Sequence, residues 1–168
     1  LPLTTGVTGI LPEANGGTGS ATKNFVDLTT NQTIGGNKVF TSNASFNGQS
    51  IGKGNATGGE NLAVGAGAMN AVSTGVRNTA IGNSAMLNYE GTSFDNNTSV
   101  GYSNLVSLTT GSGNTSVGAE SMLALTTGTS NTSIGNQSLI NTTGSNNVGV
   151  GKSAGNLNST GNNNTIIG

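Results

Sequence analysis

Gly151-Lys152-Ser153 matches, in residue types and order, the last three residues of a phosphate-binding loop. At the end of a phosphate-binding loop, Gly-Lys-Ser places backbone N–H groups and a lysine against phosphate. That motif also needs a glycine five residues before Gly151, where this sequence has Asn146, and a helix after the lysine. The residues that follow are rich in Asn, Ser and Gly, which are poor helix formers. The match is therefore partial, and the surrounding sequence must decide whether this stretch is a phosphate-binding site.

The other reactive side chains give little support to catalysis. The chain has neither His nor Cys, so a Ser-His or Cys-His nucleophile pair cannot form and zinc ligation is not expected. Its six Asp and Glu residues are scattered, whereas glycosidase chemistry needs two carboxylates a defined distance apart. Glu90, Asp95, Asn96 and Asn97 are a candidate calcium-ligand group, which we interpret as a solvated loop. The sequence predicts no enzyme, no cofactor and no metal site.

The composition is not that of an ordinary globular domain. The 168 residues include 29 Gly and 7% charged residues, against roughly 25% charged residues in a typical domain. The five Lys and Arg residues are scattered, so no nucleic-acid footprint is expected. No apolar run approaches the length of a membrane span, which argues against membrane insertion. Small polar residues with regularly spaced Ile, Val, Leu and Met indicate stacked β-structure.

A repeat of about 17 residues explains both the composition and the Gly151 motif. The pattern Asn-Thr-Ser/Ala-Ile/Val-Gly recurs, and its closing glycines are spaced 17, 19, 17, 17, 16 and 17 residues apart. A weaker copy, Ser50-Ile51-Gly52, precedes the first full one. Lys152 stands where other repeats have Ala, Asn or Tyr, so a phosphate site is not needed to explain it. The closing glycines are Gly65, Gly82, Gly101, Gly118, Gly135, Gly151 and Gly168.

Each repeat predicts one coil of an all-β, parallel β-solenoid or β-roll over residues 50–168. Residues alternate between the two faces of a strand, so we expect the β-branched residue before each closing glycine to point inward. The glycine permits a tight corner, and the repeat Asn is expected to adopt a left-handed turn. The expected inward core column is Val64, Ile81, Val100, Val117, Ile134, Val150 and Ile167.

A second apolar position lies eight residues after the repeat Asn. Two large apolar side chains per coil make a thin core, and repeat units bury their apolar faces only by stacking. We therefore expect the second column to face a threefold axis as the interface of a homotrimer; the alternative places both columns inside a single-chain solenoid. The candidate interface residues are Met69, Met86, Leu105, Met122 and Leu139.

One repeat has 19 residues, which makes it longer than the others, and it carries most of the aromatic residues of this region. We expect its extra residues, within 89–95, to bulge outward from a corner without breaking the stack. Tyr89, Phe94 and Tyr102 would then form a surface cluster, which is the candidate ligand contact. The alternative is that these rings only fix the longer turn in place.

Two segments precede the repeats. Residues 1–24 predict an extended Gly/Thr-rich linker without a periodic apolar stripe. Residues 25–49 predict a small β shaft element, with a hairpin-like turn at Gly35-Gly36-Asn37. The repeat region, 50–168, forms the third part.

The sequence TTGSGNTSVGAESMLALTTGTSNTSIGNQSL (109–139) resembles the Asn-Thr-Ala-Ile-Gly repeats of phage and bacterial fibre proteins. It is similar to the head repeats of trimeric autotransporter adhesins, which are left-handed β-rolls that assemble three chains side by side. Residues 1–20 and 25–48 look like a linker and a shaft element of phage tail fibres. The resemblance implies a homotrimeric fibre segment in a virion tail or an extracellular appendage. Its expected partners are other fibre or tail proteins and a glycan or protein receptor on the host-cell surface.

Two other functions stay open at this point. A bacterial cell-surface trimeric adhesin has the same repeats. An ice-binding solenoid needs flat ranks of Thr. Such a rank is present but is interrupted by Leu62 and Val148. Its members are Thr79, Thr98, Thr115, Thr132 and Thr165.

Overall fold

The computed structural model describes residues 42–71, 73–92 and 95–168, and in these ranges the chain is all-β without a helix. The predicted linker (1–24) and the predicted turn at 35–37 lie outside the described residues, as does most of the predicted shaft element (25–49). The nine strands of the described ranges are β1 (Ala44–Phe46), β2 (Gln49–Gly52), β3 (Leu62–Val64), β4 (Thr79–Ile81), β5 (Thr98–Val100), β6 (Thr115–Val117), β7 (Thr132–Ile134), β8 (Val148–Val150) and β9 (Thr165–Ile167).

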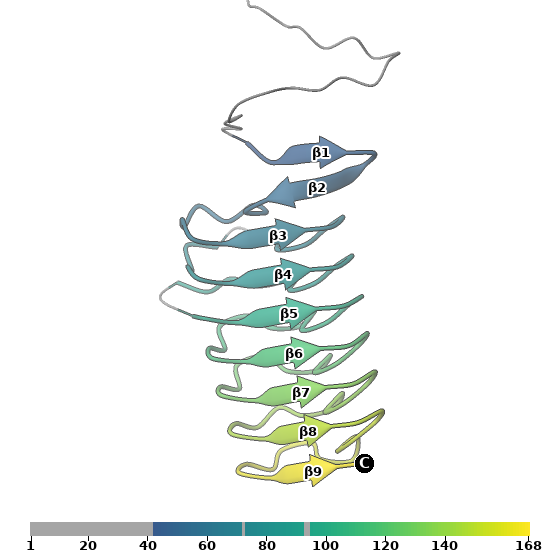
Figure 1. Ribbon diagram of the computed structural model, residues 1–168. Coiled ribbons are helices and arrows are strands. Elements are labelled where there is room, and N and C mark those ends of the chain that lie inside the picture. Colours follow the sequence, from purple (N-terminus) through teal and green to yellow (C-terminus); the bar gives the residue numbers. More distant parts are fainter. Residues whose placement is uncertain (1–41, 72, 93–94) are drawn as a thin grey trace, which may run out of the picture. The chain divides into compact units, whose positions relative to one another are not determined.

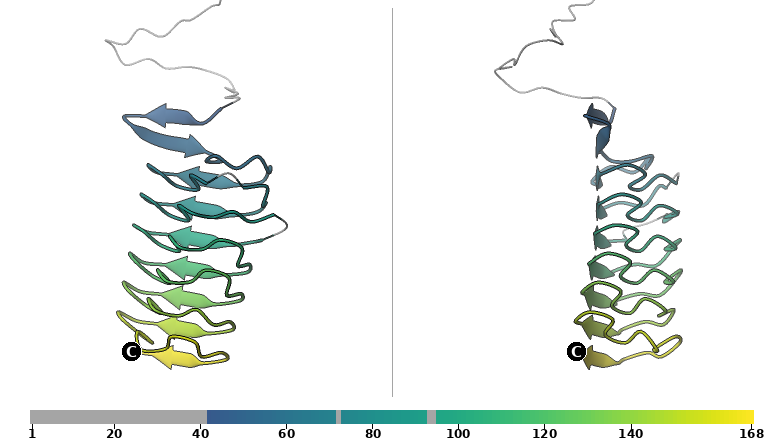
Figure 2. Two further views of the ribbon diagram at one scale, coloured as in Figure 1. Left: turned by 180° about the vertical axis from the view of Figure 1, so that it is seen from behind. Right: turned by 90° about the vertical axis from the view of Figure 1, so that its right-hand side faces the viewer.

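These strands form one sheet in chain order (Figure 1). Strands β3 to β9 run parallel, and equivalent repeat residues pair directly, such as Thr115 with Thr132 and Val117 with Ile134. Each repeat therefore contributes one strand and one return segment. Figure 2 shows the strands along one straight side of this unit and the return segments on the other side. The predicted parallel β-solenoid with one coil per repeat is confirmed.

An antiparallel hairpin precedes the parallel stack. Strand β2 pairs antiparallel with both β1 and β3. The hairpin turn is Asn47-Gly48, with φ of 49° and 78°, as a two-residue type I′ turn requires. The weaker copy at residues 50–52 is thus a hairpin strand and not a coil. The expected boundary between residues 49 and 50 was wrong, because it divides this hairpin.

The interior wall of the sheet is built from the middle residue of each three-residue strand. Because side chains alternate, this residue points away from the Thr before it and from the Ile or Val after it. It is small and buried in every coil from β3 to β8, and the half-buried Ile166 takes its place in β9. The buried residues are Ala63, Ala80, Ser99, Ser116, Ser133 and Gly149.

The Met/Leu column fills the interior from the opposite side. Its side chains are at most 1% exposed, so the expectation that they form a trimer interface was wrong. Left-handed corners with φ between 46° and 50° turn them inward. A second interior column, eleven residues after the repeat Asn, was not predicted; its buried members are Tyr89, Leu108, Leu125 and Thr142. With both columns inside, only small residues fit on the inner face of the strands. The Met/Leu column is Met69, Met86, Leu105, Met122 and Leu139.

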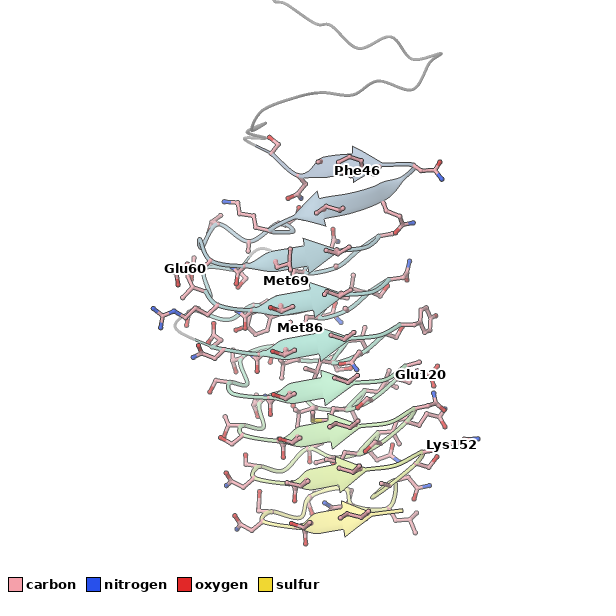
Figure 3. The ribbon with its side chains drawn as sticks, in the orientation of Figure 1. Phe46, Glu60, Met69, Met86, Glu120 and Lys152 are labelled. Carbon is pink, nitrogen blue, oxygen red and sulfur yellow. The ribbon has the colours of Figure 1, made fainter. Side chains whose placement is uncertain are left out.

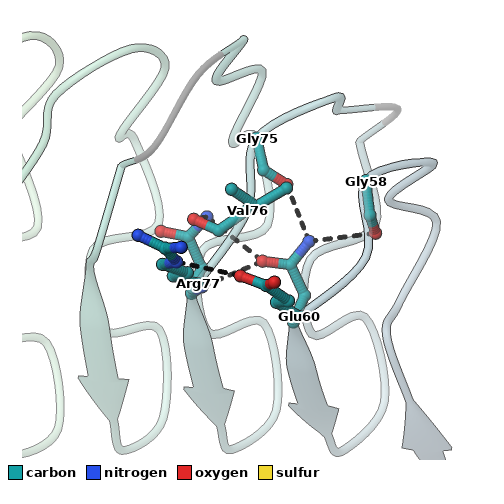
Figure 4. Close-up of polar contacts among 7 residues, drawn as sticks. Gly58, Glu60, Gly75, Val76 and Arg77 are labelled. Carbon is teal, nitrogen blue, oxygen red and sulfur yellow. Dashed lines mark hydrogen bonds and ion pairs between the residues drawn. The ribbon is translucent and has the colours of Figure 1, made fainter.

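The repeat asparagines form a ladder through the stack. Asn61 and Asn78 begin it: the Asn61 side-chain oxygen accepts hydrogen bonds from the backbone N and Nδ2 of Asn78, at 2.9 and 3.2 Å (Figure 4). The Asn61 amide donates to the Gly75 carbonyl at 2.7 Å. The left-handed corner lies one residue before each Asn, for example at Glu60 (φ 59°), and not at the Asn as expected. The later ladder members are Asn97, Asn114, Asn131, Asn147 and Asn164.

Candidate interaction surface

The outward face of the sheet carries a continuous column of Ile and Val. Direct pairing of successive strands stacks these residues, and Val117 and Ile134 are 39% and 45% exposed. The expectation that this column points inward was therefore wrong, although its stacking is confirmed. Its seven members, called the Ile/Val stripe below, are Val64, Ile81, Val100, Val117, Ile134, Val150 and Ile167.

The physical reason for this inversion is the width of the coil. In the coils of β4, β5 and β6 the return segment already supplies two large buried side chains, so an Ile or Val facing inward from the strand would overfill the interior. Ser99 instead uses its inward position for hydrogen bonds to Asn104, at 3.0 Å to the carbonyl and 2.9 Å to Oδ1. Short polar side chains therefore suit this narrow interior, and the bulkier β-branched residue points outward.

The first residue of each strand also faces outward, beside the Ile/Val stripe. It is Thr in β4 to β7, where the register stacks the threonines directly, and again in β9, where Thr165 pairs with Val148. In β3 and β8 the rank holds Leu62 and Val148, as the sequence indicated. None of the outward positions of β3 to β9 is charged. Strands spaced about 4.8 Å apart give this face a length of roughly 30 Å.

The predicted aromatic cluster is not assembled. Tyr89 is completely buried in the second interior column, so placing it on the surface was wrong. Burial raises the pKa of its hydroxyl, and the neighbouring Asp95 carboxylate adds to this effect, so the ring stays neutral. Tyr102 is exposed in the turn that follows β5, and Phe94 lies outside the described residues. Of the three candidate ligand contacts, Tyr102 is thus the one described on the surface.

The longer repeat does not disturb the stack. Strands β4 and β5 keep the same pairing as their neighbours, with Thr79 opposite Thr98. The Tyr89 hydroxyl and Asp95 carboxylate enter the interior beside Gly75 and Gly91, where an added Cβ would collide with one or both of them. Glycine is therefore needed at these two positions for space.

One ion pair joins two charged residues of the described ranges. Arg77 and Glu60, on adjacent coils, make an exposed ion pair at 2.8 Å (Figure 4). In the candidate calcium group, Asp95 and Asn97 are buried, whereas Glu90 and Asn96 are exposed. Within the described ranges, no three His, Cys, Asp or Glu side chains gather as metal ligands. That part of the chain also has no helix suited to crossing a membrane.

Gly151-Lys152-Ser153 forms a corner of the solenoid. Gly151 has φ of 123°, close to the 135° of Gly118 and Gly135. A Cβ on Gly151 would lie 2.7 Å from the Gly168 carbonyl oxygen, so the next coil needs glycine here for close approach. The exposed Lys152 is followed by a turn and then β9, where a phosphate-binding loop would have a helix.

Comparisons with protein-family models, with curated proteins and with solved structures find no match to this chain.

Proposed function

We propose that this chain is a structural segment of a homotrimeric fibre of the phage-tail type, in which three copies pack along the outward face of their sheets. The fibre positions a receptor-binding part at the host-cell surface or contributes to that binding. It works as part of a virion tail fibre or a related extracellular appendage, together with other fibre or tail proteins. The segment is a scaffold and has no catalytic role.

The observation that carries the proposal is the exposed Ile/Val stripe. Single exposed apolar residues are normal on a protein surface, but a continuous apolar patch indicates an interaction site. Here the apolar side chains repeat at every coil of the parallel stack, on a face without charged residues at its outward positions. A rigid, uncharged surface of this kind can be covered by a second copy without desolvating an ion.

The proposal of three copies draws on the resemblance of the repeats to trimeric fibres and adhesin heads. A closed ring covers the apolar stripe of every member, whereas open-ended association would continue to add chains. A face-to-face dimer would also cover the stripe, so the measured number of copies separates these arrangements.

Light scattering on the purified chain, with mass determined across the elution peak, tests the assembly. The proposal expects three times the chain mass of 16.4 kDa at micromolar concentration. A folded monomer would contradict both the fibre proposal and the role of the stripe. A dimer would keep the role of the stripe and contradict the trimer.

A bacterial cell-surface trimeric adhesin remains the second candidate, because it would use the same face for assembly. The full-length gene and its neighbours separate the two. Tail genes beside it would support the phage fibre, and a signal peptide with a membrane anchor would support the adhesin.

Ice binding is a third candidate, favoured by the stacked outward threonines. Strands β4 to β7 present Thr ranks next to aliphatic ranks on a straight face. This function requires the face to be open to solvent, so it competes with the trimer for one surface. Thermal hysteresis from a monomeric sample would support ice binding, whereas its absence from a trimeric sample is expected for the fibre.

A further inference from the structure

We propose that the hairpin β1–β2 aligns the three copies of the fibre along its length, with Phe46 and Ile51 as the contacts between copies. This inference rests on the proposed trimer. The Ile/Val stripe by itself does not fix the position of one copy relative to the next along the fibre axis.

The repeats create an alignment problem. Strands β4 to β7 present a Thr and an Ile or Val in the same outward positions. A copy displaced by one coil, about 4.8 Å, would thus meet nearly the same side chains in its neighbour. Periodic surfaces of this kind specify register weakly. An element outside the repeat is needed to favour one alignment.

The hairpin is such an element, and its apolar residues lie on the correct face. Ile51 pairs directly with Val64, the first member of the stripe, and with Ala44 of β1. Paired residues project to the same face, and Phe46 is two residues from Ala44 on the same strand. Phe46 and Ile51 are 56% and 40% exposed, and Figure 3 labels Phe46 at this end of the sheet. Ile51 and Phe46 therefore extend the apolar face beyond Val64, and Phe46 adds a large aromatic side chain to it.

Symmetry makes another copy of the hairpin the natural partner of this patch. When the copies are aligned, the three hairpins lie at the same height, so their Phe46 and Ile51 side chains can cover one another. A displacement by one coil would move a hairpin past its counterpart and leave Phe46 of one copy uncovered. An aromatic ring buries a large apolar area, so this loss would disfavour the displaced assembly.

Disulfide trapping can measure alignment, because the chain has no cysteine of its own. Copies carrying Val117→Cys and copies carrying Ile134→Cys, distinguished by tag length, are co-expressed. A disulfide needs Cα atoms about 4.4–6.8 Å apart, so aligned copies join Val117→Cys to Val117→Cys. A mixed disulfide, which joins a Val117→Cys copy to an Ile134→Cys copy, requires the two copies to be displaced by one coil. The same pair is prepared with Phe46→Thr and Ile51→Thr, which remove the large apolar side chains but leave a residue with high strand propensity at each position.

We expect the parent to give same-position disulfides with a trace of the mixed product. In the double Thr variant the mixed product should rise at least about tenfold, the ratio expected when a large apolar side chain loses its buried contact. Leu157→Thr is the matched control, because Leu157 is 92% exposed and lies in a return segment away from the hairpin. It should leave the mixed product at the parent level.

An unchanged mixed product in the double Thr variant, with its circular dichroism and assembly mass intact, would overturn the proposal. Abundant mixed product in the parent would overturn it as well. If the double variant does not fold, Phe46→Thr alone provides the same comparison. A monomeric parent would contradict the proposed trimer itself, and this result is recognised from mass before any disulfide is formed.

Discussion

The side-chain oxygen of Asn114 accepts two hydrogen bonds from Asn131 in the next coil, 3.0 Å from its backbone N and 3.1 Å from its Nδ2. The Asn114 amide in turn donates to Asn97 at 3.1 Å and to the Gly128 carbonyl at 2.9 Å. Both asparagines are fully buried. The coils of Asn114 and Asn131 are thus joined to their neighbours by buried amides that both donate and accept.

Asn114→Ala should destabilise the solenoid strongly. It would leave the backbone N–H and side-chain amide of Asn131 and the Gly128 carbonyl without these partners. Each buried polar group left unpaired costs about 1–3 kcal/mol. Urea denaturation at a fixed protein concentration measures the change in the free energy of unfolding. Asn136→Ala is the matched control, because exposed Asn136 makes a surface hydrogen bond to Ala119 at 3.1 Å, and its removal should cost about 0.5 kcal/mol or less. Equal losses would contradict the ladder.

Two buried serines should respond differently to the same substitution. Ser121 Oγ is bonded to Ser116 Oγ at 2.8 Å and to Ser133 Oγ at 2.6 Å, so Ser121→Ala should cost about 1–3 kcal/mol. Ser138 Oγ has no hydrogen-bond partner in the described part of the chain. In the next strand, Gly149 stands at the position where β7 has Ser133, so no serine hydroxyl is present there.

Ser138→Ala should therefore be neutral or stabilising by up to about 1 kcal/mol, because it removes a buried hydroxyl without a hydrogen bond. Thermal unfolding of both variants, followed by circular dichroism at one concentration, gives the comparison. A larger loss at Ser138 than at Ser121 would show that this hydroxyl has a stabilising contact.

The longer repeat should be sensitive to added volume at Gly91. A Cβ there would collide with the Tyr89 hydroxyl and lie 2.6 Å from Asp95 Oδ2. Gly91→Ala should therefore destabilise by about 1–3 kcal/mol, the usual cost of overpacking. The matched control is Gly59→Ala, because an added Cβ at Gly59 meets no atom within 4 Å. Restricting the unfolded chain should make that change neutral or slightly stabilising. Calorimetry that finds both variants equally stable would contradict the tight packing around Tyr89.

The repeat spacing was sufficient to predict the strands, because a fixed period brings equivalent residues into register. It could not decide which face of each strand was inside. Alternation along the strand places the side chains of Ser116 and Val117 on different faces of the sheet. It does not fix which of the two faces is the interior one. That choice depends on the space left by Met122 and Leu125, which come from the return segment. The small residue between Thr and Val was the available signal, since a narrow interior admits little else.

Three other features required signals that the prediction did not use. The Asn in each of the seven full repeats is explained by the ladder, whose hydrogen bonds pass between coils and cannot be seen within one repeat. The buried position of Tyr89 follows from its equivalence to Leu108 and Leu125, eleven residues after the repeat Asn. The dipeptide Asn47-Gly48 is a strong hairpin signal, and it marks where the antiparallel strands meet.

The central claim is that copies of this chain associate through the Ile/Val stripe, and paired glutamate substitutions test it most directly. Val117→Glu places a charge in the middle of the stripe, whereas Leu157→Glu makes the same chemical change at an exposed residue off the sheet face. Sedimentation velocity at micromolar concentration, with circular dichroism to confirm folding, is the measurement. The account predicts a trimer for the native chain and for Leu157→Glu, and dissociation for Val117→Glu, because burying an unpaired charge is costly. A Val117→Glu chain that still sediments as the native trimer would contradict it.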